Sequence, residues 1–135
     1  MITDKERDKS KSEMLAFFQS VPANKRSLLG LMGGWAVNFL LETRGVRHIG
    51  SRDIDIFFDS HRMTQKSAVE LIESRGFSPQ STFRWVKFFE WDSEKQISET
   101  EAQKLDQHNL VRIFLDLASP VNLDHTFGEQ LLSEV

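Results

Sequence analysis

The sequence contains no cysteine and no tyrosine, and it has only 3 prolines among 135 residues. Without cysteine the chain forms no disulfide and no thiolate-based zinc site, as expected of a protein in a reducing cytoplasm. No apolar run approaches the roughly 18 residues that a membrane helix needs. The charged N-terminus also lacks the apolar core of a signal peptide. We therefore expect a cytoplasmic protein that does not enter a membrane.

The chain also has no excess of positive charge, because 17 Lys and Arg residues stand against 20 Asp and Glu residues. The formal net charge is −3 and the sequence pI is about 5.8, which argues against a protein that holds nucleic acid mainly by neutralising phosphates. The hydrophobic content of 39% and charged content of 27% are those of an ordinary globular domain. A chain of this length is expected to form a single domain over residues 1–135.

The pattern of apolar residues and turn residues predicts alternating helices and strands. Helices are expected over 4–20, 35–45 and 61–75, the last with Ser60 as its N-cap, and a further helix begins at 124–135. Strands are expected over 27–34, 53–59, 83–91 and 111–119, and the polar stretch 93–109 is expected to be a loop with some helix. This order predicts an α/β fold, in which helices flank a central sheet.

Two aspartates, Asp53 and Asp55, stand one residue apart at the start of the predicted strand 53–59. Residues i and i+2 of a strand point to the same face, with their Cβ atoms about 7 Å apart. Aspartate is a poor strand former, and like charges on one face repel. Two explanations remain open: this face of the strand is exposed to water, or it holds a hard divalent cation such as Mg²⁺.

A third aspartate, Asp116, lies within the apolar strand "VRIFLDLAS". An ionised carboxylate in such a run needs a partner. The partner is either an arginine, in a salt bridge, or a metal ion shared with the first two aspartates.

A pair of glycines, Gly33 and Gly34, stands where the predicted strand 27–34 meets the following helix. Without side chains, the backbone there can approach a phosphate closely, and the first N–H groups of the helix can bind it. The other explanation is an ordinary tight turn, since the segment matches neither the G-x-G-x-x-G fingerprint nor a P-loop.

The combination "LMGGWAVNFLLETRG…GSRDIDIFF" resembles the nucleotidyltransferase superfamily, especially its lincosamide-type and AbiEii-type toxin branches. The shared pattern is an apolar residue, Gly-Gly or Gly-Ser, a helix, then Asp-x-Asp, with a third acid on a later strand. The resemblance covers residues 28–59, with a looser extension to residue 119. It implies a nucleotidyltransferase-like fold, with a central mixed β-sheet flanked by α-helices.

The resemblance also implies a reaction. An NTP binds with Mg²⁺ or Mn²⁺, and a nucleoside monophosphate passes to an acceptor hydroxyl with loss of pyrophosphate. Asp53 and Asp55 would hold the metal ions, and Asp116 would hold a second metal or help to deprotonate the acceptor. Gly33 and Gly34 would contact the triphosphate.

The resemblance leaves the roles of two neighbouring residues open. Ser51 would support the loop before the aspartates or touch a phosphate. Arg52 is one of three arginines near the aspartates, with Arg44 and Arg47, and the resemblance does not define which of them would bind the phosphates.

The acceptor is not defined by the sequence, and a small molecule, a protein side chain and an RNA end all remain open. Enzymes of this family often carry a C-terminal helical domain that binds the acceptor. We therefore expect a minimal member, a homo-oligomer, or a chain without an acceptor site. The alternative function is a non-catalytic module of the same fold that binds a nucleotide or a protein, as in a toxin–antitoxin pair. A purely structural α/β domain, whose acidic strand faces water, is the third interpretation.

Overall fold

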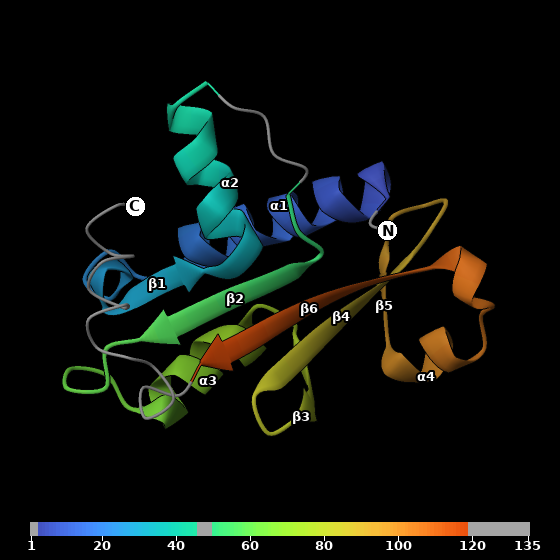
Figure 1. The fold of residues 1–135 in the computed structure, drawn as a ribbon. Helices are drawn as coiled ribbons and strands as arrows, with labels where there is room; N and C mark the ends of the chain where they lie inside the picture. The colour runs from blue at the N-terminus through green and yellow to red at the C-terminus, as the bar shows by residue number, and fades with distance from the viewer. Residues whose placement is uncertain (1–2, 46–49, 119–135) are drawn as a thin grey trace.

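The computed structural model describes residues 3–45 and 50–118 of the chain. Within these residues there are four α-helices and six strands (Figure 1). The helices are α1 (Asp4–Ser20), α2 (Gly33–Thr43), α3 (Gln65–Ser74) and α4 (Glu99–Gln103). The strands are β1 (Leu29–Met32), β2 (Asp53–Phe58), β3 (Ser78–Ser81), β4 (Arg84–Glu90), β5 (Gln96–Ile97) and β6 (Leu110–Ala118). Short 3₁₀ turns at Arg26–Leu28 and Gln107–Asn109 lead into β1 and β6.

The strands form a single mixed sheet with the order β1-β2-β6-β4-β3, and β5 pairs with the edge of β4. The central pair, β2 and β6, is parallel, whereas the other pairs are antiparallel. The predicted α/β class, with a central mixed sheet flanked by helices, is therefore confirmed. The topology brings residues 53–58 directly beside residues 110–118, although the two segments are far apart in the sequence.

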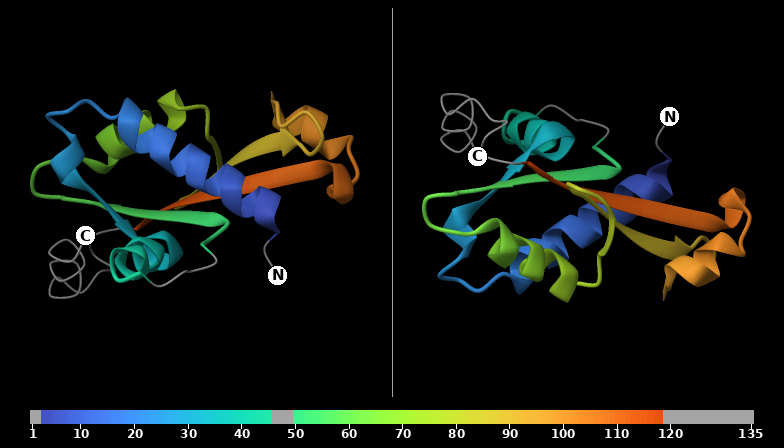
Figure 2. Two further views of the ribbon diagram at one scale, coloured as in Figure 1. Left: turned by 90° about the horizontal axis from the view of Figure 1, so that it is seen from above. Right: turned by 90° about the horizontal axis from the view of Figure 1, so that it is seen from below.

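The two faces of the sheet have different neighbours. Figure 2 shows α1 and α3 against one face and α2 on the other side. Strand alternation sends Ile54 and Ile56 of β2, and Ile113 and Leu115 of β6, toward α1 and α3, where all four are fully buried. The main core lies in this layer. The alternate residues of the same strands, which include the aspartates, point to the face that α2 covers only in part.

Helix α1 closes the core and is anchored at its start. Thr3 and Glu6 form a capping box, which satisfies N–H groups of the first turn. Met14 and Phe17 are 2% and 0% exposed, whereas Leu15 is 43% exposed because it points away from the buried face. None of the helices in the described parts of the chain is long and apolar enough to cross a membrane.

Several element boundaries differ from the prediction. Ser60 does not begin a helix: Asp59 accepts a hydrogen bond from the His61 backbone in a turn, and α3 begins at Gln65 with Thr64 as its N-cap. Strand β3 was not predicted, and all four of its residues are exposed. It pairs with β4 through the backbone at the edge of the sheet. Because neither of its faces is buried, its sequence has no alternation of apolar and polar residues. The helix expected over 124–135 lies outside the described residues.

Candidate functional site

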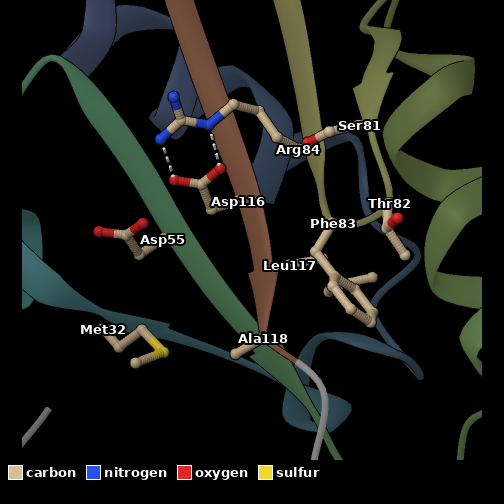
Figure 3. A pocket seen from close by; sticks show the side chains of 9 residues that line it. All are labelled: Met32, Asp55, Ser81, Thr82, Phe83, Arg84, Asp116, Leu117 and Ala118. Carbon is tan, nitrogen blue, oxygen red and sulfur yellow. Dashed lines mark hydrogen bonds and ion pairs between the residues drawn. The ribbon is translucent and has the colours of Figure 1, made fainter. Parts of the chain in front are cut away.

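The three predicted carboxylates lie on the same face of the sheet. In the parallel ladder between β2 and β6, Asp55 is opposite Asp116 and Asp53 is opposite Phe114. Neighbouring strands are about 5 Å apart, so Asp55 and Asp116 lie side by side. Figure 3 shows both side chains on the same side of the sheet, each coming from its own strand. The sequence spacing brought Asp53 and Asp55 together, and the strand register adds the third carboxylate.

Arg84 of β4 is the immediate partner of Asp116. The two residues are opposite each other in the antiparallel ladder between β4 and β6. Arg84 Nε donates to Asp116 Oδ1 at 2.7 Å and a terminal guanidinium nitrogen donates to Oδ2 at 2.9 Å (Figure 3). The same guanidinium lies 3.7 Å from Oδ2 of Asp53. Of the two partners that the sequence left open for Asp116, an arginine or a metal ion, the structure contains the arginine.

The negative charge of this face exceeds what the arginines neutralise. Burial, then repulsion from Asp116, a hydrogen bond with Asp116 and repulsion from Asp53 raise the pKa of Asp55 from 3.8 to about 6, although Arg84 opposes the shift. Burial also raises the pKa of Asp53, against the attraction of Arg84 and Arg52. Oδ1 of Asp53 is buried and receives no hydrogen bond from the described residues. Such an oxygen is suited to a cation that adds charge to the site.

The two glycines allow the start of α2 to pack against this face. Gly33 has φ +69°, and a Cβ atom added to it would overlap Oδ2 of Asp55. A Cβ atom on Gly34 would lie 2.8 Å from the Cβ atom of Ser51. Within the described residues, Met32 provides no side-chain cap for the first N–H groups of α2. The close approach of the backbone to the Asp55 carboxylate therefore depends on glycine.

Ser51 and Arg52 shape the entry into β2. The Ser51 hydroxyl accepts a hydrogen bond from the Asp53 backbone N–H at 3.1 Å and donates to the Asp53 carbonyl oxygen at 2.9 Å. Of its two predicted roles, Ser51 fulfils loop support in this structure. Arg52 lies 3.5 Å from Glu6 and 3.8 Å from Asp53 Oδ1. Its guanidinium carbon also lies over the Phe114 ring, 5.6 Å from the ring centroid.

A pocket of about 460 Å³ opens beside the carboxylates (Figure 3). Its lining residues come from β1, β2, the β3–β4 hairpin and β6: Met32, Asp55, Ser81, Thr82, Phe83, Arg84, Asp116, Leu117 and Ala118. One wall is therefore charged, whereas the hairpin wall offers two hydroxyl groups and the Phe83 ring, which is 37% exposed. This size is within the range of small-ligand sites, which combine apolar walls with a few polar groups.

The residues fit a hard divalent cation, with one restriction. Their donors are carboxylate oxygens, which Mg²⁺ and Mn²⁺ prefer, and the buried oxygen of Asp53 accepts no hydrogen bond from the described residues. Over residues 3–45 and 50–118, however, no group of three His, Cys, Asp or Glu side chains is arranged as a metal site. Asp116 has both oxygens on Arg84. Asp53 and Asp55 are therefore the carboxylates that could hold a cation here, and Asp116 could join them only if Arg84 released it.

Arg84 is the site residue that the sequence analysis missed. Its strand, "FRWVKFFEW", was predicted, and alternation places Arg84 on the face opposite the buried Trp85. The pairing of β4 with β6 and its register were needed to bring the guanidinium to Asp116.

Comparisons of the chain with protein-family models, with curated proteins and with solved structures found no match. A function for this site must therefore be inferred from the geometry and chemistry of its own residues.

Proposed function

We propose that this protein is a metal-dependent nucleotidyltransferase, which moves a nucleoside monophosphate from an NTP to an acceptor hydroxyl. The observation that supports the proposal best is that Asp53, Asp55 and Asp116 share one sheet face, beside the start of α2 at Gly33. Phosphoryl and nucleotidyl transfer depend mainly on positioning and charge neutralisation, and an acidic face beside an uncapped helix start suits both.

Each residue has a specific task in this proposal. Asp53 and Asp55 hold Mg²⁺ or Mn²⁺, and Asp116 joins them once Arg84 has moved. When bound, the cation neutralises charge on the transferred group and aligns the attacking and leaving oxygens. Gly33 lets the start of α2 pack directly against the Asp55 carboxylate, and the first N–H groups of α2 bind phosphate oxygens beside it.

The wall formed by Ser81, Thr82 and Phe83 receives the remainder of a ligand. Hydroxyl groups and an exposed aromatic ring can bind a sugar, a base or a small acceptor. We propose a small molecule or a protein as the acceptor and the cytoplasm as the location. A second copy of the chain remains a further candidate partner, which would complete the acceptor side.

One observation favours the alternative, a non-catalytic module that binds nucleotide. Arg84 engages both oxygens of Asp116, so in this state the third carboxylate is not available. A module that binds nucleotide through Asp53 and Asp55 alone would not require it. The two functions differ in whether the nucleotide is cleaved.

Incubation with α-³²P-labelled NTPs, with Mg²⁺ or Mn²⁺ and with extracts fractionated into small molecules and proteins separates the two functions. The enzyme releases pyrophosphate and labels an acceptor, and Asp55→Asn lowers the rate by about 100-fold or more, because it removes a ligand of the cation. Asp106→Asn is the matched control, since Asp106 is exposed and outside the site. Cation-dependent binding without labelling would support the binding module. If the protein shows no binding and no labelling, both functions are refuted.

A further inference from the structure

Arg84 takes the place of a cation among the three carboxylates. Its guanidinium is bidentate on Asp116, lies 3.7 Å from Oδ2 of Asp53, and stacks over the Phe114 ring at 4.6 Å. Figure 3 shows it at the pocket wall, above Asp55 and Asp116. The arginine therefore holds the oxygens that a bound metal ion would use.

The location of this ion pair argues against a purely structural role. The side chains of Arg84 and Asp116 are 37% and 29% exposed, and pairs at such exposure contribute little to folding stability. On the other face of the sheet, the Lys87–Glu13 pair is buried, with side chains 3% and 10% exposed, and links β4 to α1. The fold thus has a core ion pair elsewhere, whereas the Arg84–Asp116 pair lies in an open pocket and can separate at small cost.

A divalent cation would compete directly with Arg84. The guanidinium uses both oxygens of Asp116, and two positive groups cannot share these oxygens without strong repulsion. Three carboxylates, Asp53, Asp55 and Asp116, face the guanidinium groups of Arg84 and Arg52, and Arg52 is shared with Glu6. A divalent cation at these carboxylates would supply the positive charge that Arg84 now supplies, so its binding would weaken the attraction between Arg84 and Asp116.

A polyphosphate is the natural new partner for the released guanidinium. The planar fork of arginine binds phosphate oxygens in the same bidentate manner as a carboxylate. Arg84 starts at the pocket wall beside Ser81 and Phe83, and the Phe114 ring can support its plane after Asp116 is released. A cation-bound polyphosphate brings negatively charged oxygens close to the guanidinium that the cation displaces.

We propose that Arg84 is an exchangeable phosphate-binding residue. Without ligand it holds Asp116, and when a divalent cation and a polyphosphate bind together, its guanidinium moves from Asp116 to a phosphate oxygen. This inference rests on the proposed function for the presence of the cation site. It adds a residue that controls access to the third carboxylate and recognises the triphosphate part of the substrate.

Two affinities test the exchange: that for Mn²⁺ alone, from the electron paramagnetic resonance signal of free Mn²⁺, and that for inorganic tripolyphosphate at saturating Mn²⁺, from calorimetry. We expect Arg84→Gln to bind Mn²⁺ about tenfold more tightly and tripolyphosphate about tenfold more weakly than the wild type. Arg112→Gln is the matched control. Arg112 lies on the same face of β6, about 13 Å from Asp116, beyond the screening length, and its replacement leaves both affinities within about twofold.

The outcomes separate the inference from the proposed function. If Arg84→Gln leaves Mn²⁺ affinity unchanged or weaker, or leaves tripolyphosphate affinity unchanged, the exchange is refuted while the cation site stands. If neither the wild type nor Arg84→Gln binds Mn²⁺, the proposed function fails, and the exchange fails with it. Should Arg84→Gln not fold, the Arg84 Nε–H resonance of the wild type decides: it must shift when Mg²⁺ and tripolyphosphate are added together, and an unmoved resonance refutes the exchange.

Discussion

Replacing Asp55 with asparagine should stabilise the folded protein in the absence of metal, and should do so only where the aspartate is ionised. Asp55 lies beside Asp116 and under the start of α2, where its negative charge is disfavoured by burial and by the neighbouring carboxylates. Asparagine has nearly the same shape and no charge. The substitution therefore removes the repulsion and retains the packing around Gly33.

The size and sign of the effect follow from linkage. The pKa of Asp55 is raised from 3.8 to about 6 in the folded chain, so the folded state binds more protons than the unfolded state between these values. Wild-type stability consequently falls as pH rises through the window from about 4 to 6. The full shift corresponds to about 3 kcal/mol, and since the site is partly open to solvent, we expect about 1–2 kcal/mol at pH 7.5.

Urea unfolding monitored by circular dichroism at pH values from 4 to 8 measures this difference. Asp55→Asn should exceed the wild type in free energy of unfolding at pH 7.5, and the difference should shrink toward pH 4. Mg²⁺ should also reduce it, because a cation that binds the folded wild type adds stability. Asp106→Asn controls for loss of one surface charge. An Asp55→Asn difference that is independent of pH, or of the opposite sign at pH 7.5, would refute the electrostatic reasoning.

Two further predictions concern the frame around the site. Gly33→Ala should destabilise the fold by about 2 kcal/mol or more in urea unfolding, because positive φ and overlap with a carboxylate act together. Gly45→Ala, at φ +73° with no described atom within 4 Å, should lose only about 1 kcal/mol, and equal losses would contradict the overlap. Lys87→Met should cost about 3 kcal/mol or more in the same assay because it leaves Glu13 buried without its 2.7 Å partner, and Glu13→Leu combined with Lys87→Met should recover most of that loss. No recovery in the double variant would contradict this account.

The apolar alternation of the central strands was readable from the sequence. In both strands an apolar residue stands at every second position. The residues at these positions include Ile54 and Ile56 in β2 and Ile113 and Leu115 in β6, and all four are fully buried on one face of the sheet. Alternation also placed Asp53 and Asp55 on the opposite face, because a strand has only two sides. These predictions succeeded since they depend on local periodicity alone.

Relations between distant segments could not be read in the same way. That Asp55 lies opposite Asp116, and Asp116 opposite Arg84, depends on the strand order β2-β6-β4 and on the register of each ladder. The buried Lys87–Glu13 pair was missed for the same reason, since its residues are on β4 and α1. Strand β3 was missed because backbone pairing to β4, with all its side chains exposed, leaves no periodic signal.

The resemblance to nucleotidyltransferases rests on the residues from 28 to 59 and on Asp116, whereas Arg84 is outside the pattern. The structure adds that the third carboxylate, Asp116, is held by Arg84 through both of its oxygens. A nucleotidyltransferase built in this way would assemble its cation site only as the substrate enters.

The most direct test of the central proposal is equilibrium binding of α-³²P-labelled NTPs to the wild type and to Asp53→Asn combined with Asp55→Asn, with and without Mg²⁺ or Mn²⁺. We predict that the wild type binds at least one NTP, that binding requires the divalent cation, and that the double variant abolishes it while remaining folded. Binding that ignores the cation, or that survives the loss of both carboxylates, would contradict the assignment of a metal-dependent nucleotide site to this face of the sheet.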